Sequence, residues 1–279
     1  MYSNIFLISD GCLIFDTLGF LKQMEEDIKN TVVWTGGNVG SLVIFLRALG
    51  YNIERSVDKL SLLKCIPSLV FGGNLEVNSD KEIFKELEDW IDCMLEEKRF
   101  FKPDITLKEV NTLSGIFPNF ITYKDDDIIG LNPKDYPDIK LKDAILASVC
   151  NIGVYTYYKE FTSFSDHDVY PKHIDIKRDD YTETLFLLNY TELSYEKGVT
   201  CINNIEDSLT KMYFRRIKRK AKRDKDIIII NGYHVKYDYD VYTMNQHIRN
   251  GARHYDWFSQ GEDTRNKMKY LKNIVQKQL

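Results

Sequence analysis

The residues with the greatest potential for chemistry lie around a glycine-rich segment near the amino terminus. Thr31–Trp34 is rich in β-branched residues and leads into T-G-G-N-V-G at residues 35–40, and Ser41–Leu49 is then almost continuously apolar. A β-branched run followed by glycines and a long apolar run predicts a strand, a sharp turn and a buried helix. The residue at the centre of that turn is Asn38.

Asparagine limits the chemistry that such a turn can support. In hydrolases of the α/β class, the equivalent turn carries a nucleophilic serine, and the N-terminus of the following helix stabilises the oxyanion. A carboxamide is not deprotonated near neutral pH and forms no ordinary acyl-enzyme. Ser41 is the nearest hydroxyl, but it lies three residues further along and is expected to point away from the turn. The segment therefore predicts hydrolase-like geometry without the nucleophile.

Composition narrows the class of protein. The chain has 279 residues, of which 43% are hydrophobic, so it can bury the core of one α/β domain with or without an extension. A formal net charge of -4 gives no overall attraction to phosphate backbones, and nucleic acid is not an expected partner. The abundance of Lys, Ile, Asn, Asp and Tyr suits an AT-rich genome, such as that of a large DNA virus or some bacteria.

The cysteines and the amino terminus predict the cellular location. Five widely spaced cysteines favour buried, reduced thiols over a disulfide framework. They are Cys12, Cys65, Cys93, Cys150 and Cys201. The first apolar run is short, has no basic flank and ends at Asp10, which is typical of neither a signal peptide nor a membrane span. We expect a cytoplasmic protein, or one peripheral to membranes, with no transmembrane segment.

The hydrophobic pattern predicts a mainly parallel sheet with helices on its faces. Strands are expected at Asn4–Ser9, Thr31–Trp34, Asn119–Tyr123, Phe161–Phe164, Leu185–Leu188, Ile227–Ile230 and, as a half-buried strand or hairpin arm, Tyr233–Tyr242. Helices are expected at Leu18–Ile28, Ser41–Leu49, Ser79–Glu97 and Lys140–Cys150, from about Asn204, and in a terminal region after the Ile227–Ile230 strand.

Four segments together resemble the patatin-like phospholipases. They are Ile8–Lys22 (ISDGCLIFDTLGFLK), Thr35–Leu49 (TGGNVGSLVIFLRAL), Ile105–Tyr123 (ITLKEVNTLSGIFPNFITY) and Tyr136–Gly153 (YPDIKLKDAILASVCNIG). The resemblance is good over residues 5 to about 175 and poor in the last third. It implies a three-layer patatin-like α/β hydrolase fold, with a patatin-like phospholipase domain at 1–175. Residues 176–279 would be a C-terminal extension that completes this domain or packs on it.

The resemblance also implies roles for individual residues. Asn38 stands at the position of the serine nucleophile, and Gly36 and Gly40 flank it on the nucleophile turn. Asp166 stands where the family has the aspartate that activates the serine. Half of the catalytic dyad is therefore retained.

Two other elements depart from the family pattern. Asp10, Gly11 and Cys12 stand in the loop whose backbone N–H groups would form the oxyanion hole, but the run of three glycines and the basic residue that follows are absent. His167 and Asp168 replace the small residues that follow the aspartate. With Asn38, these departures predict a catalytically inactive homologue that acts as a structural, lipid-binding or protein-interaction component. The alternative is an active lipid acyl hydrolase of the phospholipase A type, with a Ser/Asp dyad in its unmodified form.

No cofactor and no metal are expected. The densest group of metal-type side chains runs from Asp166 to His173, and a metal site needs three or four ligands that converge with defined geometry. The spacing of these residues does not specify such geometry. A solvated polar loop is the simpler interpretation.

A basic segment, Phe214–Arg223 (FRRIKRKAKR), stands out in this acidic chain. As a helix it would present a cationic face beside a thin apolar one, which fits an anionic lipid or membrane surface, a nucleic acid or an acidic protein partner. A solvated helix edge is the alternative. Its basic residues are Arg215, Arg216, Lys218, Arg219, Lys220, Lys222 and Arg223.

If this basic segment binds membranes, the chain will sediment with liposomes that contain anionic lipid and will stay in solution with neutral ones. Binding should be lost at about 0.5 M salt, where the Debye length is only a few ångströms. Replacing Lys218, Arg219 and Lys220 by glutamine should weaken sedimentation at low salt. Binding that resists both salt and charge removal would contradict the idea.

Overall fold

The structure is a computed structural model that describes most of the chain. The described residues are 2–9, 11–66, 77–124, 127–149, 157–158, 161–162, 184–191, 227–232 and 241–259. The predicted helix from about Asn204 and the basic segment Phe214–Arg223 lie outside these ranges.

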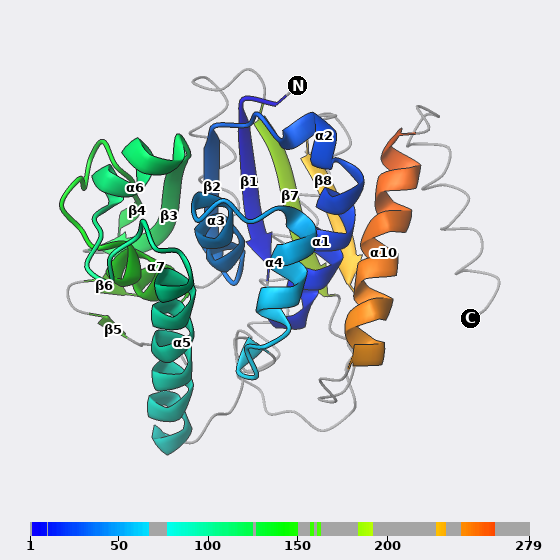
Figure 1. Ribbon diagram of the computed structural model, residues 1–279. Coiled ribbons are helices and arrows are strands. Elements are labelled where there is room, and N and C mark those ends of the chain that lie inside the picture. The colour runs from blue at the N-terminus through cyan, green and yellow to red at the C-terminus, as the bar shows by residue number, and fades with distance from the viewer. Residues whose placement is uncertain are drawn as a thin grey trace.

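Strands and helices alternate through the first half of the chain (Figure 1). The described strands are β1 (Asn4–Ser9), β2 (Val33–Asn38), β3 (Phe117–Lys124), β4 (Asp127–Leu131), β5 (Tyr157–Tyr158), β6 (Phe161–Thr162), β7 (Thr184–Thr191) and β8 (Ile227–Gly232). The described helices are the 3-10 turn η1 (Gly11–Leu13), α1 (Ile14–Gln23), α2 (Glu25–Ile28), α3 (Gly40–Ala48), α4 (Ile53–Leu60), α5 (Val77–Glu97), α6 (Leu107–Ser114), α7 (Leu141–Val149) and α10 (Val241–Ser259).

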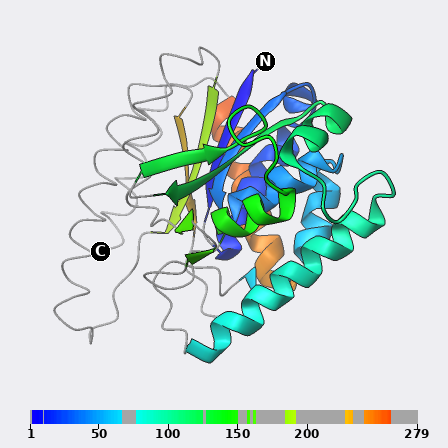
Figure 2. The same cartoon turned by 90° about the vertical axis from the view of Figure 1, so that its left-hand side faces the viewer.

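All of these strands join one sheet in the order β5-β6-β3-β2-β1-β7-β8, with β4 also paired to β3. The central strands β3, β2, β1, β7 and β8 are parallel, and β4 and β6 run antiparallel to β3. Helices α1, α3, α4, α5 and α10 lie on one side of this sheet (Figures 1 and 2). The predicted α/β class with a mainly parallel sheet is confirmed. Because β7 pairs with β1, residues after 175 belong to the same sheet as the amino terminus.

Strand β1 is buried on both of its faces. Ile5 and Leu7 join the core cluster formed with the helices. Phe6 and Ile8 point to the opposite face and are also buried, and the Phe6 ring packs 5.3 Å from that of Phe186 in β7. A parallel strand in this position requires cover on both faces, as a three-layer arrangement provides.

Four polar side chains cross the sheet in a buried row. Asn4 Nδ2 donates to Thr184 Oγ1 at 3.4 Å, and Thr35 Oγ1 donates to Asn4 Oδ1 at 3.4 Å. Asn119 Nδ2 donates to Thr35 Oγ1 at 3.3 Å, so the row links β7, β1, β2 and β3. Since buried polar groups need partners, a slip of any of these strands would leave amides or hydroxyls unpaired. The row therefore specifies the strand register.

Four details differ from the sequence prediction. The second strand is Val33–Asn38 instead of Thr31–Trp34, so Gly36 and Gly37 lie in β2 and not in the turn, because they pair with Leu7 and Ile8 of β1. The first helix begins at Ile14 instead of about Leu18, and it breaks at Met24, whose φ of -98° and ψ of 6° separate α1 from α2. Tyr242 lies in the first turn of α10 and not in a strand. Cys93 is exposed, whereas Cys65 is buried as expected, because the amphipathic α5 places Cys93 on its solvent side.

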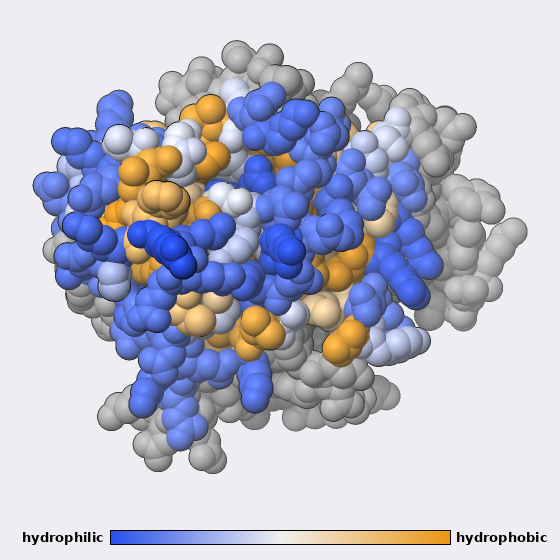
Figure 3. All heavy atoms as spheres, viewed as in Figure 1, coloured by the Kyte–Doolittle hydropathy of each residue, from blue (hydrophilic) through white to orange (hydrophobic). Residues whose placement is uncertain are grey.

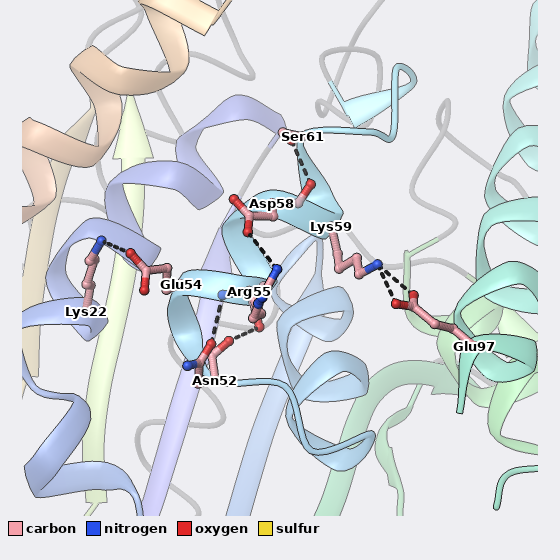
Figure 4. A network of polar contacts seen from close by, with 9 residues as sticks. Lys22, Asn52, Glu54, Arg55, Asp58, Lys59, Ser61 and Glu97 are labelled. Atoms are coloured by element: carbon pink, nitrogen blue, oxygen red, sulfur yellow. Dashed lines mark hydrogen bonds and ion pairs between the residues drawn. The ribbon is translucent and has the colours of Figure 1, made fainter. Parts of the chain in front are cut away.

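Polar contacts orient α4 between α1 and α5 (Figure 4). Lys22 of α1 pairs with Glu54 at 2.9 Å, and Lys59 pairs with Glu97 of α5 at 2.6 Å. Asn52 caps the N-terminus of α4 with its side chain. Ion pairs this exposed contribute little stability, so their effect is mainly on orientation.

A more buried ion pair joins α2 to α3. Arg47 Nη1 lies 3.0 Å from Glu25 Oε1 and also donates to the Tyr51 carbonyl at 3.1 Å. Burial lowers the pKa of Arg47, and the neighbouring Glu25 raises it in partial compensation. The Arg47 guanidinium also lies 5.1 Å from the centre of the Trp34 ring, and Ile53 N–H donates to Glu25. These contacts hold the end of α3 that is distant from the turn at Asn38.

Replacing Glu25 by Gln should lower the free energy of unfolding by about 1–2 kcal/mol, because Arg47 would stay buried without a countercharge. Urea unfolding measures this difference. Glu26→Gln is the matched control: Glu26 pairs with Lys29 in solvent, and its replacement should leave the free energy of unfolding unchanged within error. Equal losses in the two variants would contradict the assignment.

Candidate functional site

The carboxyl ends of β1 and β2 lie side by side, with Ser9 in register with Asn38. From there the chain enters Gly11–Leu13 after β1 and α3 after β2. The sheet order reverses at β1, since β2 and β3 lie on one side of it and β7 and β8 on the other. In open α/β sheets, ligands bind beyond the carboxyl ends of the strands where the order reverses. The candidate site therefore lies between these two connections.

The turn after β2 has unusual backbone geometry at Asn38. Its φ is 51°, and within the described ranges it is the sole non-glycine residue with a positive φ. Asn tolerates this left-handed region better than most residues do. Val39 then has a helical φ of -61°, and α3 begins at Gly40. Position 38 thus stands at the tip of a strand-turn-helix element, where its residue is fully buried.

Glycines on both sides of this turn, Gly36 within β2 and Gly40 at the start of α3, are required by close contact with β1. A Cβ at Gly36 would lie 2.9 Å from the Leu7 carbonyl oxygen and 2.6 Å from Ile44 Cδ1. A Cβ at Gly40 would lie 2.7 Å from the same Leu7 oxygen. All three distances are shorter than a Cβ normally allows, so the chain can pass over β1 here only with glycine at both positions.

The turn after β1 forms the other side of the site. Gly11 has a φ of 44°, and the 3-10 turn Gly11–Leu13 leads directly into α1. Burial, and to a lesser extent the charge of Asp16, raises the pKa of the Cys12 thiol to about 12. Cys12 is therefore protonated at neutral pH and is neither a nucleophile nor a metal ligand in this state. Asp10 lies outside the described residues.

The overall fold is similar to known structures. No protein-family model and no curated protein sequence matches the chain. The structure of VipD from Legionella pneumophila superposes with a TM-score of 0.52 at 11% identity, covering 92% of this chain and 66% of VipD. The fold is patatin-like. The predicted three-layer patatin-like class is thereby confirmed.

Two structures of ExoU superpose less well. The type III effector protein ExoU gives a TM-score of 0.44 at 11% identity, and full-length ExoU in complex with SpcU, from Pseudomonas aeruginosa, gives 0.46 at 13%. They cover 94% and 93% of this chain and 53% of ExoU. The chain thus spans about two thirds of VipD and about half of ExoU.

In this patatin-like fold, Ser41 has a structural position. Its Oγ lies 3.2 Å from the Gly36 carbonyl oxygen and 2.7 Å from Ser148 Oγ, which donates to the Ile121 carbonyl at 2.6 Å. Both hydroxyls are buried. Ser41 therefore ties α3 to α7 and β3, and none of these contacts is with a base that could activate it.

The remaining predicted site residues fall outside the described ranges. They are Asp10, Asp166, His167, Asp168, His173 and the seven basic residues from Arg215 to Arg223. The pairing of Asn38 with Asp166 stays a prediction. Within the described ranges, no group of three or more His, Cys, Asp or Glu side chains is arranged to hold a metal ion.

Sequence reasoning missed a buried polar cluster next to the turn after β1. Asp16 of α1 is fully buried and lies 2.6 Å from His247 Nδ1 and 2.6 Å from Asn250 Nδ2, both on α10. The available signal was an aspartate inside the apolar run of α1. Its partners follow more than 230 residues later, so spacing could not identify them.

Replacing Gly40 by Ala should lower the free energy of unfolding by about 2–3 kcal/mol, because the new methyl group would collide with the Leu7 carbonyl. Gly50→Ala is the control. Gly50 has a φ of 80° but open space around an added Cβ, so it should lose only about 1 kcal/mol from its backbone conformation. Thermal or urea unfolding compares the two. A loss at Gly40 no larger than that at Gly50 would argue against a tight contact between the turn and β1.

Proposed function

We propose that this chain is a patatin-like protein without ester hydrolase activity, which uses the site between its first two turns to bind lipid. The observation that carries the proposal is Asn38 at the tip of the strand-turn-helix element. Acyl transfer through a serine-type turn needs a nucleophile there, and a carboxamide cannot supply one. The fold supports binding and positioning, and the chemistry of position 38 does not support covalent catalysis.

The loop after β1 supports the same proposal. An efficient oxyanion hole needs backbone N–H groups aimed at the developing charge, and consecutive glycines allow the backbone to approach that closely. This loop has a single glycine, Gly11, followed by the half-buried Cys12. The departure from the patatin-like pattern therefore involves both the nucleophile and the loop that would stabilise the intermediate.

The polar groups at the site suit the ester or headgroup oxygens of a lipid. Asn38 carries an amide, and the N-terminus of α3 directs its backbone N–H groups to the same end of the sheet. Ser9 Oγ is buried beside Asn38 and has no hydrogen-bond partner among the described residues. A buried hydroxyl without a partner costs about 1–3 kcal/mol, which a ligand oxygen would recover. The Ser9 hydroxyl and the backbone N–H groups at the start of α3 are donors that suit a lipid oxygen.

We propose that any contact with a membrane is peripheral. On the face shown in Figure 3, hydrophilic residues predominate and hydrophobic residues form small separate patches. None of the helices in the described ranges combines the length and the apolar character needed to cross a bilayer. We propose that lipid reaches the site from a membrane surface or as a single molecule, and that a protein partner is the alternative occupant.

The second candidate function is a lipid acyl hydrolase with serine at position 38 and Asp166 as its activating base. The intact turn favours it: Gly36 and Gly40 still permit the close approach to β1, so a serine could occupy position 38 without repacking. Under this alternative only the nucleophile is missing.

The unmodified chain should hydrolyse a short-chain p-nitrophenyl ester or a phospholipid no faster than its Asn38→Gly variant, which keeps the turn and removes the amide. Initial rates measured with equal amounts of folded protein decide this. Hydrolysis by the unmodified chain that Asp166→Ala abolishes would refute the proposal.

Restoring the nucleophile separates the two candidate functions. If the loop after β1 no longer supports an oxyanion, Asn38→Ser should stay inactive, because nucleophile and oxyanion stabilisation are both needed. Strong activity in Asn38→Ser that is absent from the double variant Asn38→Ser/Asp166→Ala would favour the hydrolase alternative. If Asn38→Ser stays inactive, the unmodified chain is expected to bind lipid. Extraction of a fluorescent phospholipid from vesicles measures this binding.

A further inference from the structure

A buried carboxylate lies where the C-terminal helix α10 crosses α1. Asp16 Oδ1 accepts a hydrogen bond from Asn250 Nδ2 at 2.6 Å, and Asp16 Oδ2 lies 2.6 Å from His247 Nδ1. A carboxylate offers only acceptors, so His247 Nδ1 is the donor in this contact. Both oxygens of a carboxylate on α1 are therefore held by donors from one face of α10.

The two helices meet through their backbones at this crossing. A Cβ at Gly19 would collide with the Ile248 carbonyl oxygen, and a Cβ at Gly251 would collide with the Asp16 carbonyl oxygen. Beyond the glycines, the Phe20 ring packs against Tyr255 at 5.6 Å between centroids. Because the backbones touch, α10 cannot slide along α1 without breaking the polar contacts to Asp16.

The same cluster lies next to the turn that borders Asn38. Asp16 is in the first turn of α1, which follows the 3-10 turn Gly11–Leu13 without a break, and α10 also contacts that turn. The Cys12 thiol is close enough to Asp16 to sense its charge. Removing a donor from a fully buried carboxylate is costly, so loss of His247 or Asn250 should loosen the first turn of α1 and the residues before it.

We propose that Asp16, His247 and Asn250 are positioning residues through which α10 sets the conformation of the Gly11–Leu13 turn beside Asn38. They act through α1 and are not themselves in the site. The inference rests on the proposed function in one respect: that function makes the Gly11–Leu13 turn one side of the lipid site. Its test measures the turn directly, so hydrolysis by the unmodified chain would refute the proposed function and leave this inference standing.

Cys12 provides the readout, because it lies within the turn. The full chain is treated with a maleimide under native conditions, and labelling of the Cys12 peptide is followed by mass spectrometry, with the buried Cys65 as an internal reference. His247→Leu should raise the labelling rate of Cys12 at least about ten-fold through local opening, while that of Cys65 stays unchanged.

Two control variants separate positioning from general destabilisation. His247→Asn keeps an N–H donor attached to Cγ, as His247 Nδ1 is, and should hold the Cys12 rate within about two-fold of the unmodified chain. Met244→Leu alters a partly buried side chain of α10 that packs against the core, keeps its volume and should also leave the rate unchanged. If His247→Leu does not fold, Asn250→Ala removes the other donor and should accelerate Cys12 in the same way.

Three outcomes would overturn the inference. One is an unchanged Cys12 rate in folded His247→Leu. Another is equal acceleration of Cys12 and Cys65, which would indicate global opening. The third is a rate in His247→Asn as high as in His247→Leu, because the donor would then be irrelevant.

Discussion

The contact between the turn after β2 and the backbone of β1 constrains the rest of the structure. The Leu7 carbonyl oxygen lies under both Gly36 and Gly40, so the chain can leave β2 and begin α3 only by passing directly over the central strand. That passage gives Asn38 its positive φ and places it at the carboxyl edge of the sheet beside Ser9. Since Ser41 is tied to the Gly36 carbonyl and to Ser148, the position of α7 also follows from it. The site is thus a consequence of backbone packing before any side-chain chemistry is considered.

A second backbone contact, between α1 and α10, limits the other side of the site. Gly19 and Gly251 allow these helices to touch, and the Asp16 cluster lies at the same crossing. Strand β7 pairs with β1, so the C-terminal third contributes to the sheet as well as to the helix layer. Residues of β7 and α10 therefore pair with and pack on the first fifty residues. Their sequence nevertheless resembles the patatin-like pattern poorly.

Local pattern predicted the elements well and long-range pairing poorly. The apolar runs identified β1 at its observed bounds and α3 within one residue, because buried strands and helices need continuous or periodic hydrophobicity. The glycine spacing predicted a turn before the helix but placed its start too early, because Gly36 and Gly37 still pair within the sheet. By contrast, Asp16 interrupts an apolar run, and the first helix was predicted to begin only after it. The partners of Asp16 on α10 depend on a helix crossing that no local signal encodes. The row from Thr184 to Asn119 needs four strands in register, so single polar residues in each strand gave no sign of it.

The packing of the turn depends on the glycines at 36 and 40, whereas its chemistry depends on the residue at position 38. The turn can therefore form without a nucleophile. Gly36 and Gly40 are needed for packing against β1 whatever residue stands between them, so their retention follows from stability alone. A serine at a φ of 51° would be strained, whereas asparagine is enriched several-fold in this region of backbone space. In the inactive protein that we propose, exchanging serine for asparagine would relieve strain at no cost in packing. The stability gained and the activity lost would then have the same physical origin, namely the backbone conformation that the Leu7 contact imposes.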